Sequence, residues 1–207
     1  MIDKFCEYLT NKIRKQMPEV DDERAEVINY GIQLLVGEVP KFILMLLIAG
    51  ILGVFWYAIA AFFMILPYKI VSGGFHLKTH LGCFIGTNLV YCGNAILSTH
   101  LSIPENIKVI LIISNIIFGI VMITIYAPAD TVNVPILRKK DRKIKKVLSY
   151  VFLIMNMIIA FFIPNESLSN ILIFGSLFQT FSITRLAYRL TNNEYGYETY
   201  IKQKSHA

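Results

Sequence analysis

The sequence predicts an all-α polytopic membrane protein with about six transmembrane helices and an N-terminal amphipathic helix. Of its 207 residues, 55% are hydrophobic and only 16% are charged, and its mean hydropathy is +0.56. Soluble domains usually carry roughly 25% charged residues. The composition therefore excludes an ordinary cytosolic enzyme, a disordered chain and a disulfide-stapled secreted domain. No linker or repeat interrupts the chain, so we expect a single membrane-embedded domain over residues 1–207.

The N-terminal region predicts two helices of different kinds. The first carries apolar side chains spaced by four, a pattern typical of a helix that lies in the membrane interface. This stripe consists of Phe5, Leu9, Ile13 and Met17. Pro18 is expected to end the first helix. The acidic residues 21–23 then favour the start of a second helix, because negative charge is stabilised at a helix N-terminus.

The apolar segments predict six membrane spans. Residues 42–66 contain no charged side chain and could form one tilted span, but Gly50 and Gly53 favour a break between two helices. The first of these two helices is expected to begin near Val27. Further spans are expected over residues 79–99, 107–126, 145–163 and 168–190, which proline-bearing segments separate.

The distribution of basic residues supports this number of spans. Of the 20 Lys and Arg residues, 17 lie before residue 42, between residues 138 and 146, or after residue 184. Six spans with both termini in the cytoplasm bring these regions to the cytoplasmic face, as the positive-inside rule requires. We therefore interpret the basic run 138–146 as a topology-setting loop near membrane lipids. Basic segments at an anionic membrane surface then account for the net charge of +6, and we expect no nucleic-acid partner.

One segment departs from the pattern of a plain membrane span. The adjacent glycines Gly73 and Gly74 predict a helix break, and His76, His80 and Cys83 follow within ten residues. Ionisable groups at membrane depth are candidates for function. The residues between Tyr68 and Cys83 are therefore the first candidate site.

Spacing alone leaves two candidate bases for the thiol. In one straight helix, His76 and Cys83 share a face but stand about 10.5 Å apart along the axis. His80 lies three residues from Cys83 and would be its neighbour. His76 can reach Cys83 only if the segment 73–77 is not helical and folds back over the start of the next span.

A thiol beside an imidazole suits nucleophilic catalysis. The imidazole accepts the thiol proton and leaves a thiolate–imidazolium pair, and backbone N–H groups at the start of the helix that holds Cys83 can stabilise an oxyanion. Cys92 lies nine residues further on, on the opposite face of the same helix, and is interpreted as a packed apolar residue. The odd number of cysteines argues against a disulfide framework.

Two other functions compete with a cysteine enzyme. His76, His80 and Cys83 could supply three metal ligands to a membrane hydrolase. Against this, the chain has no H-E-x-x-H motif and no carboxylate between Lys41 and Glu105. A peptide transporter or membrane scaffold would need no catalytic residue, and ordinary packing would then explain the histidines and the cysteine.

Two sequence blocks resemble the AgrB (accessory gene regulator protein B) family. The first is Lys69-x-x-Ser72-Gly73-Gly74-Phe75-His76-x6-Cys83. The second is the proline-bearing block Tyr126-Ala127-Pro128-Ala129-Asp130-Thr131-x-Asn133-x-Pro135-Ile136. The resemblance also includes the chain length, the charged amphipathic start and the basic run after the second block, so it covers nearly the whole chain.

The resemblance implies a membrane-embedded cysteine endopeptidase of a quorum-sensing bacterium. Such an enzyme cleaves an AgrD-like precursor peptide on its C-terminal side and, through an acyl-thioester, supports cyclisation to a thiolactone or lactone signal. By motif position, Cys83 is the nucleophile and His76 the base, which decides against His80. No cofactor and no metal are implied, whereas a homodimer in the bacterial cell membrane is compatible with the family.

The resemblance also marks residues that bind substrate or shape the site. These residues are Lys69, Ser72, Gly73, Gly74, Pro128 and Asp130. Family members commonly have arginine at the position of Lys69, and lysine keeps the charge but not the bidentate geometry. Asp130 has two interpretations: it orients His76 or binds substrate, or it is a turn residue beside Pro128.

Overall fold

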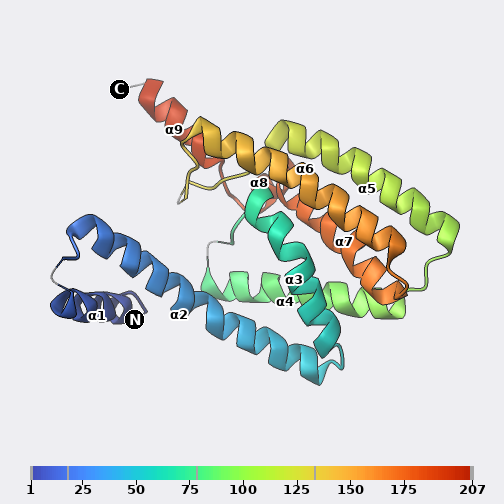
Figure 1. The fold of residues 1–207 in the computed structure, drawn as a ribbon, viewed down its shortest axis with the longest axis horizontal. Coiled ribbons are helices and arrows are strands. Elements are labelled where there is room, and N and C mark those ends of the chain that lie inside the picture. Colours follow the sequence, from blue (N-terminus) through green and yellow to red (C-terminus); the bar gives the residue numbers. More distant parts are fainter. Residues whose placement is uncertain (1, 18, 78, 133, 206–207) are drawn as a thin grey trace. The chain divides into compact units, whose positions relative to one another are not determined.

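The computed structural model describes residues 2–17, 19–77, 79–132 and 134–205, and in these ranges the chain is α-helical without a β-sheet (Figure 1). The predicted all-α fold class is confirmed. The helices are α1 (Ile2–Gln16), α2 (Asp22–Ile51), α3 (Phe55–Ser72), α4 (His80–His100), α5 (Glu105–Tyr126), α6 (Lys139–Phe162), α7 (Glu166–Ser182), α8 (Arg185–Leu190) and α9 (Gly196–Ser205).

Five helices in the described part of the chain are long and apolar enough to cross a membrane. They cover Arg24–Ile51, Phe55–Ser72, Leu81–His100, Glu105–Tyr126 and Lys139–Phe162. The predicted break at the glycines is confirmed, because α2 ends at Ile51 and Gly53 has a φ of 73°. The second helix starts at Asp22, as its acidic residues indicate, and not near Val27. Pro18, the predicted break before it, lies outside the described residues.

The predicted span 168–190 is wrong in extent, because the chain forms two helices there. Helix α7 ends at Ser182, and α8 begins at Arg185. The Thr184 side chain accepts a hydrogen bond from the backbone N–H of Ala187 at 3.3 Å, which caps the new helix. With 17 residues, α7 is at the short end of the range for a membrane span.

The described chain divides into two compact units, residues 1–48 and 49–207. In the first unit, Arg14 of α1 forms an ion pair of 2.8 Å with Asp22 at the start of α2. Thr10 Oγ1 also donates to Asn29 Oδ1 at 3.3 Å. Phe5 and Met17 of the predicted apolar stripe remain about half exposed, which leaves this face of α1 available to lipid.

In the second unit, α7 is the central helix. It contacts α3, α4, α5 and α6, and Figure 1 shows α5, α6 and α7 side by side. Side-chain amides of neighbouring helices bond to it: Asn94 of α4 donates to Ile171 O at 3.0 Å, and Asn115 of α5 donates to Ile173 O at 2.7 Å. Such bonds fix helix pairs where lipid offers no hydrophobic drive for association. Helix α7 therefore holds a defined position among its neighbours.

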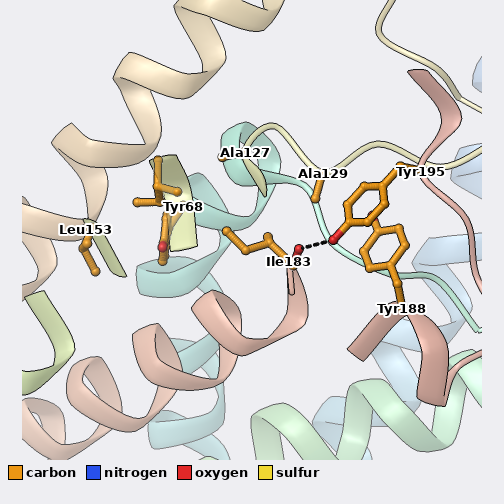
Figure 2. Close-up of a cluster of buried hydrophobic side chains, with 8 residues drawn as sticks. Tyr68, Ala127, Ala129, Leu153, Ile183, Tyr188 and Tyr195 are labelled. Atoms are coloured by element: carbon orange, nitrogen blue, oxygen red, sulfur yellow. Dashed lines mark hydrogen bonds between the residues drawn. The ribbon is translucent and has the colours of Figure 1, made fainter. Parts of the chain in front are cut away.

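This unit contains a buried cluster of hydrophobic side chains that includes Tyr68, Ile183, Tyr188 and Tyr195 (Figure 2). The rings of Tyr188 and Tyr195 stack with centroids 4.1 Å apart, and Tyr195 Oη donates to Ile183 O at 2.8 Å. Tyr188 Oη donates to Asp130 O at 3.1 Å. Burial raises the pKa of both phenols above its ordinary value. The Tyr188 bond joins α8 to the proline-bearing block, and the Tyr195 bond joins the segment after α8 to the end of α7.

Candidate active site

The predicted helix break occurs at the two adjacent glycines. Helix α3 ends at Ser72, and Gly73 and Gly74 have φ angles of 78° and 138°. A Cβ atom on Gly73 would overlap the carbonyl oxygen of Ala129, and one on Gly74 would lie 2.7 Å from Ser182 Oγ. Both positions therefore require glycine, for their backbone conformation and for the space beside them.

The two sequence blocks that the family resemblance singled out lie against each other. The backbone N–H of Ala129 donates to Ser72 O at 2.8 Å, and that of Gly74 donates to Ala129 O at 2.9 Å. These two bonds form an isolated parallel bridge between Gly73 and Ala129. The proline-bearing block thus holds the chain where it leaves α3.

Gln179 of α7 fixes the same turn from the other side. Its Nε2 donates to Ser72 Oγ at 2.9 Å and to Gly73 O at 2.7 Å. Ser72 Oγ in turn donates to Tyr68 O at 2.7 Å. Gln179 is not among the site residues predicted from the sequence, although a glutamine within the predicted span 168–190 is a signal that could have found it.

Cys83 lies in the first turn of α4. Thr79 is the N-cap residue, and its Oγ1 accepts from the backbone N–H of Gly82 at 3.0 Å. The N–H of Cys83 makes the next bond, to Thr79 O at 2.9 Å. The first N–H groups of a helix have no acceptor within it and attract negative charge. The thiol is therefore at the end of the helix that favours a thiolate and an oxyanion.

A pocket of about 250 Å³ brings three of the predicted site residues together. Lys69 comes from α3, His76 from the segment after the glycines, and Cys83 from α4. Polar side chains from α7 and from the end of α8 complete its lining, namely Gln179, Ser182 and Thr191. Apolar side chains form much of the remaining wall, including those of Ile65, Phe75, Leu77, Leu89, Val90 and Phe178.

The backbone meets one part of the condition for His76 to approach Cys83, namely a non-helical segment before α4. Residues 73–77 are not helical, and α4 begins only at His80. His76 is exposed and Cys83 is half-buried, and both line the same pocket. The side chain of His80 lies outside the described residues.

The carboxylate of Asp130 forms hydrogen bonds with residues outside the pocket. Its Oδ2 accepts from Arg142 Nη1 at 3.0 Å and from the N–H of Ile136 at 2.8 Å, and its Oδ1 accepts from the N–H of Tyr197 at 3.4 Å. The carboxylate is almost fully buried, and the Arg142 guanidinium lies 4.2 Å from the centre of the Tyr197 ring. These contacts tie the proline-bearing block to α6 and α9. Pro128 contributes through its carbonyl oxygen, which accepts from Arg142 Nη2 at 3.3 Å.

A metal centre has no support among the described side chains. No group of three or more His, Cys, Asp or Glu side chains in that part of the chain is arranged to hold an ion. The three-ligand alternative of His76, His80 and Cys83 is not tested by this result, because it includes the undescribed side chain of His80.

The fold and the pocket define a class: a polytopic α-helical membrane protein with a thiol and an imidazole in one pocket at the start of a helix. A sequence model of the family described as Accessory gene regulator B matches residues 6–183. The chain therefore belongs to the AgrB family and is a membrane protein of accessory gene regulation.

Individual relatives match most of the length of this chain. A protein of Listeria monocytogenes serovar 1/2a described as AgrB-like is 28% identical over 193 residues, which cover 91% of each chain. The accessory gene regulator protein B of Staphylococcus epidermidis is 25% identical over 182 residues, which cover 88% of each chain. No solved structure matches the chain with significance.

Proposed function

We propose that this protein is a membrane-embedded cysteine endopeptidase that cleaves a quorum-sensing precursor peptide on its C-terminal side and supports its cyclisation. The observation that carries the proposal is the pocket lined by Lys69, His76 and Cys83, with the thiol in the first turn of α4. Membership in the AgrB family supports it, since the residues that meet in the pocket are those of the family signature.

The first step is formation of an acyl-enzyme. The imidazole of His76 takes the proton of Cys83 Sγ, and the thiolate attacks the carbonyl carbon of the scissile peptide bond. Backbone N–H groups at the start of α4 stabilise the oxyanion. The C–N bond then breaks, and the imidazolium gives its proton to the departing amine. The C-terminal fragment leaves, while the N-terminal part of the precursor is a thioester on Cys83.

The second step closes the ring. A thiol of the bound peptide attacks the thioester carbonyl, the bond to Cys83 Sγ breaks, and the proton of the attacking thiol passes through His76 to Cys83. A peptide hydroxyl in place of the thiol gives a lactone. Exchange between thioesters is nearly neutral in free energy, whereas hydrolysis is downhill, so water must be excluded. The apolar wall around Phe75, Leu77 and Phe178 serves this need.

Lys69 contributes a basic side chain to the lining of the pocket. In the proposal it attracts a carboxylate of the precursor, as a point charge without the fork geometry of arginine. Asp130 and Pro128 act through the backbone of the proline-bearing block and keep the glycine turn in place. We assign both residues a role in shaping the site.

The proposal includes an orientation in the membrane. With α7 as a sixth crossing, both termini and the pocket face the cytoplasm, where the basic residues 138–146 meet anionic lipid headgroups. The AgrD-like precursor then approaches from the cytoplasmic leaflet. The single chain supplies all the residues assigned to the reaction, and a homodimer stays a prediction from the family resemblance.

Purified protein in detergent or nanodiscs, incubated with a candidate precursor, tests the proposal. A suitable candidate is a short peptide encoded beside this chain, with an amphipathic leader, a central Cys or Ser and an acidic tail. We expect cleavage by the wild type and by Cys92→Ala, and none by Cys83→Ala, as measured by mass spectrometry of the products. Cleavage by a folded Cys83→Ala variant would overturn the assignment of the nucleophile.

Two inhibitors separate the competing functions in the same assay. Thiol alkylation should abolish cleavage, and a chelator should leave it unchanged. The opposite result would identify a metal-dependent hydrolase. A folded protein that binds the candidate peptide but never cleaves it would instead indicate a transporter or scaffold.

A further inference from the structure

The segment that follows α8 reaches the pocket from outside the region that the family model matches. That match ends at residue 183. Thr191, at the end of α8, lines the pocket together with His76 and Cys83. Two residues later, Asn193 Nδ2 donates to His76 O at 2.7 Å. A side chain 117 positions away in the sequence thus contacts the backbone of the proposed base.

The amide of Asn193 is itself held in one orientation. Its Nδ2 also donates to Thr191 Oγ1 at 2.9 Å, and its backbone N–H donates to Tyr188 O at 2.8 Å. Asn192, between them, adopts a φ of 55°, which turns the chain back toward the pocket. The Thr191 hydroxyl is fixed by a 2.8 Å bond to Ala187 O. The donor to His76 therefore belongs to an ordered turn at the end of α8.

This turn is anchored on both sides by the buried cluster. Tyr188 precedes it and Tyr195 follows it, and their rings stack on each other. Tyr188 bonds to Asp130 O, which ties the turn to the proline-bearing block. Tyr195 bonds to Ile183 O, which ties the turn to the end of α7 (Figure 2). Asn193 is thus part of the framework that also holds the glycine turn.

The backbone that carries His76 needs contacts such as the Asn193 bond to hold its position. It follows two glycines, which restrict the backbone least of all residues. The N–H of Phe75 bonds to Ser182 O at 3.3 Å, and Thr79 caps the start of α4. His76 lies between these two points, and a displacement of about 1 Å in a catalytic group can cost about a hundredfold in rate.

We propose that Asn193 is a positioning residue for the base: its amide fixes the carbonyl of His76 and thereby keeps the imidazole in the pocket with Cys83. The inference rests on the proposed function, because it assigns Asn193 a role through His76. It extends the functional site to Thr191 and Asn193, beyond the part of the chain that the family model covers.

Substitution of Asn193 tests this role. Asn193→Leu has similar size but no donor, and Asn193→Ser is a milder change whose hydroxyl is too short to reach the carbonyl. We expect kcat for precursor cleavage to fall about tenfold to a hundredfold in Asn193→Leu, with little change in KM. Asn192→Gly is the matched control, because it removes the neighbouring side chain and tolerates the positive φ.

A second readout separates positioning from a general loss of stability. The rate of Cys83 alkylation is measured against pH for wild type, His76→Ala and the Asn193 variants. Positioning predicts that the curves of Asn193→Leu and Asn193→Ser move toward that of His76→Ala, while Asn192→Gly follows the wild type. Lower thermal stability alone would leave the curve in place.

The outcomes distinguish this inference from the proposed function. If Cys83→Ala is inactive but a folded Asn193→Leu keeps the wild-type kcat and alkylation curve, the positioning role is wrong and the peptidase proposal stands. If Asn193→Leu does not fold, unchanged kcat and alkylation curves in Asn193→Ser would equally overturn the positioning role. Cleavage by Cys83→Ala would overturn the peptidase itself, whatever the Asn193 variants do.

Discussion

The two cysteines of α4 have the same side chain and lie on the same helix, yet their surroundings differ completely. Cys83 is half-buried in the first turn and lines the pocket with His76. Cys92 is only 3% exposed, and its Sγ lies 3.9 Å from Asn88 Oδ1, one turn earlier on α4. We therefore expect the reactivity of each thiol to depend on its position along the helix and on the backbone conformation just before the helix begins.

The difference arises from the backbone. At the first turn of α4, the chain has just passed two glycines and a non-helical segment, which can bring an imidazole and helix N–H groups toward one sulfur. Around Cys92 the chain is continuous helix, whose N–H groups already have acceptors. A cysteine there has the character of a small apolar residue.

The largest expected effect is a difference in thiol reactivity. In the folded protein, iodoacetamide should modify Cys83 and abolish cleavage, whereas Cys92 should react only after denaturation, because access and thiolate character govern alkylation. Peptide mapping by mass spectrometry measures both sites in one sample. Fast modification of Cys92 in folded protein would remove the distinction between the two cysteines of α4.

The next effect concerns the turn that brings His76 to the pocket. Gly73→Ala should lower kcat by about a hundredfold, because the new methyl group overlaps Ala129 O and displaces the segment that follows. Gly93→Ala is the control on α4: nothing lies within 4 Å of its Cβ position, and alanine is favoured by up to about 1 kcal/mol in a helix. Steady-state cleavage rates compare the two variants. Equal rates in Gly73→Ala and Gly93→Ala would show that cleavage does not depend on the glycine turn.

A smaller effect is expected where the proline-bearing block is anchored. Arg142→Met leaves the buried Asp130 carboxylate without its ion-pair partner, which should destabilise the protein by about 3 kcal/mol. Lys143→Met, at the exposed neighbouring position, should change stability by less than about 0.5 kcal/mol. Thermal unfolding in detergent compares the two variants, and similar midpoints would argue against a structural role of the Asp130–Arg142 pair.

The smallest effect concerns the cap of α4. Thr79→Ala removes the acceptor for the Gly82 N–H and should cost about 1 kcal/mol of stability. Thr79→Ser retains a hydroxyl and should lie near the wild type. Hydrogen exchange at residues 80–83 measures this local change. Unchanged protection in Thr79→Ala would mean that the first turn does not depend on its cap.

Local signals in the sequence predicted the parts of the site that local chemistry controls. The helix break at Gly73 and Gly74 follows from the residue type alone, and the resemblance supplied Cys83 and His76 as candidate nucleophile and base. The end of α7 was missed because the apolar pattern continues past Ser182, and the cap at Thr184 was not recognised as a helix start.

Contacts between distant segments could not be predicted in this way. Gln179 bonds to Gly73 across 106 positions, and Asn193 bonds to His76 across 117. Neither amide shows a period or a spacing that relates it to its partner. Asp130 was recognised, but its ion pair with Arg142 was not, because the basic run was interpreted only as a topology signal.

The most direct test is to trap the acyl-enzyme. A precursor whose ring-closing Cys or Ser is replaced by alanine cannot cyclise, so the N-terminal fragment should accumulate as a thioester on Cys83. Intact-protein mass spectrometry should then show the mass of that fragment on wild type and on Cys92→Ala, removed by hydroxylamine and absent from Cys83→Ala. Cleavage of the precursor without any adduct on Cys83, or with the adduct on another residue, would contradict the proposed nucleophile.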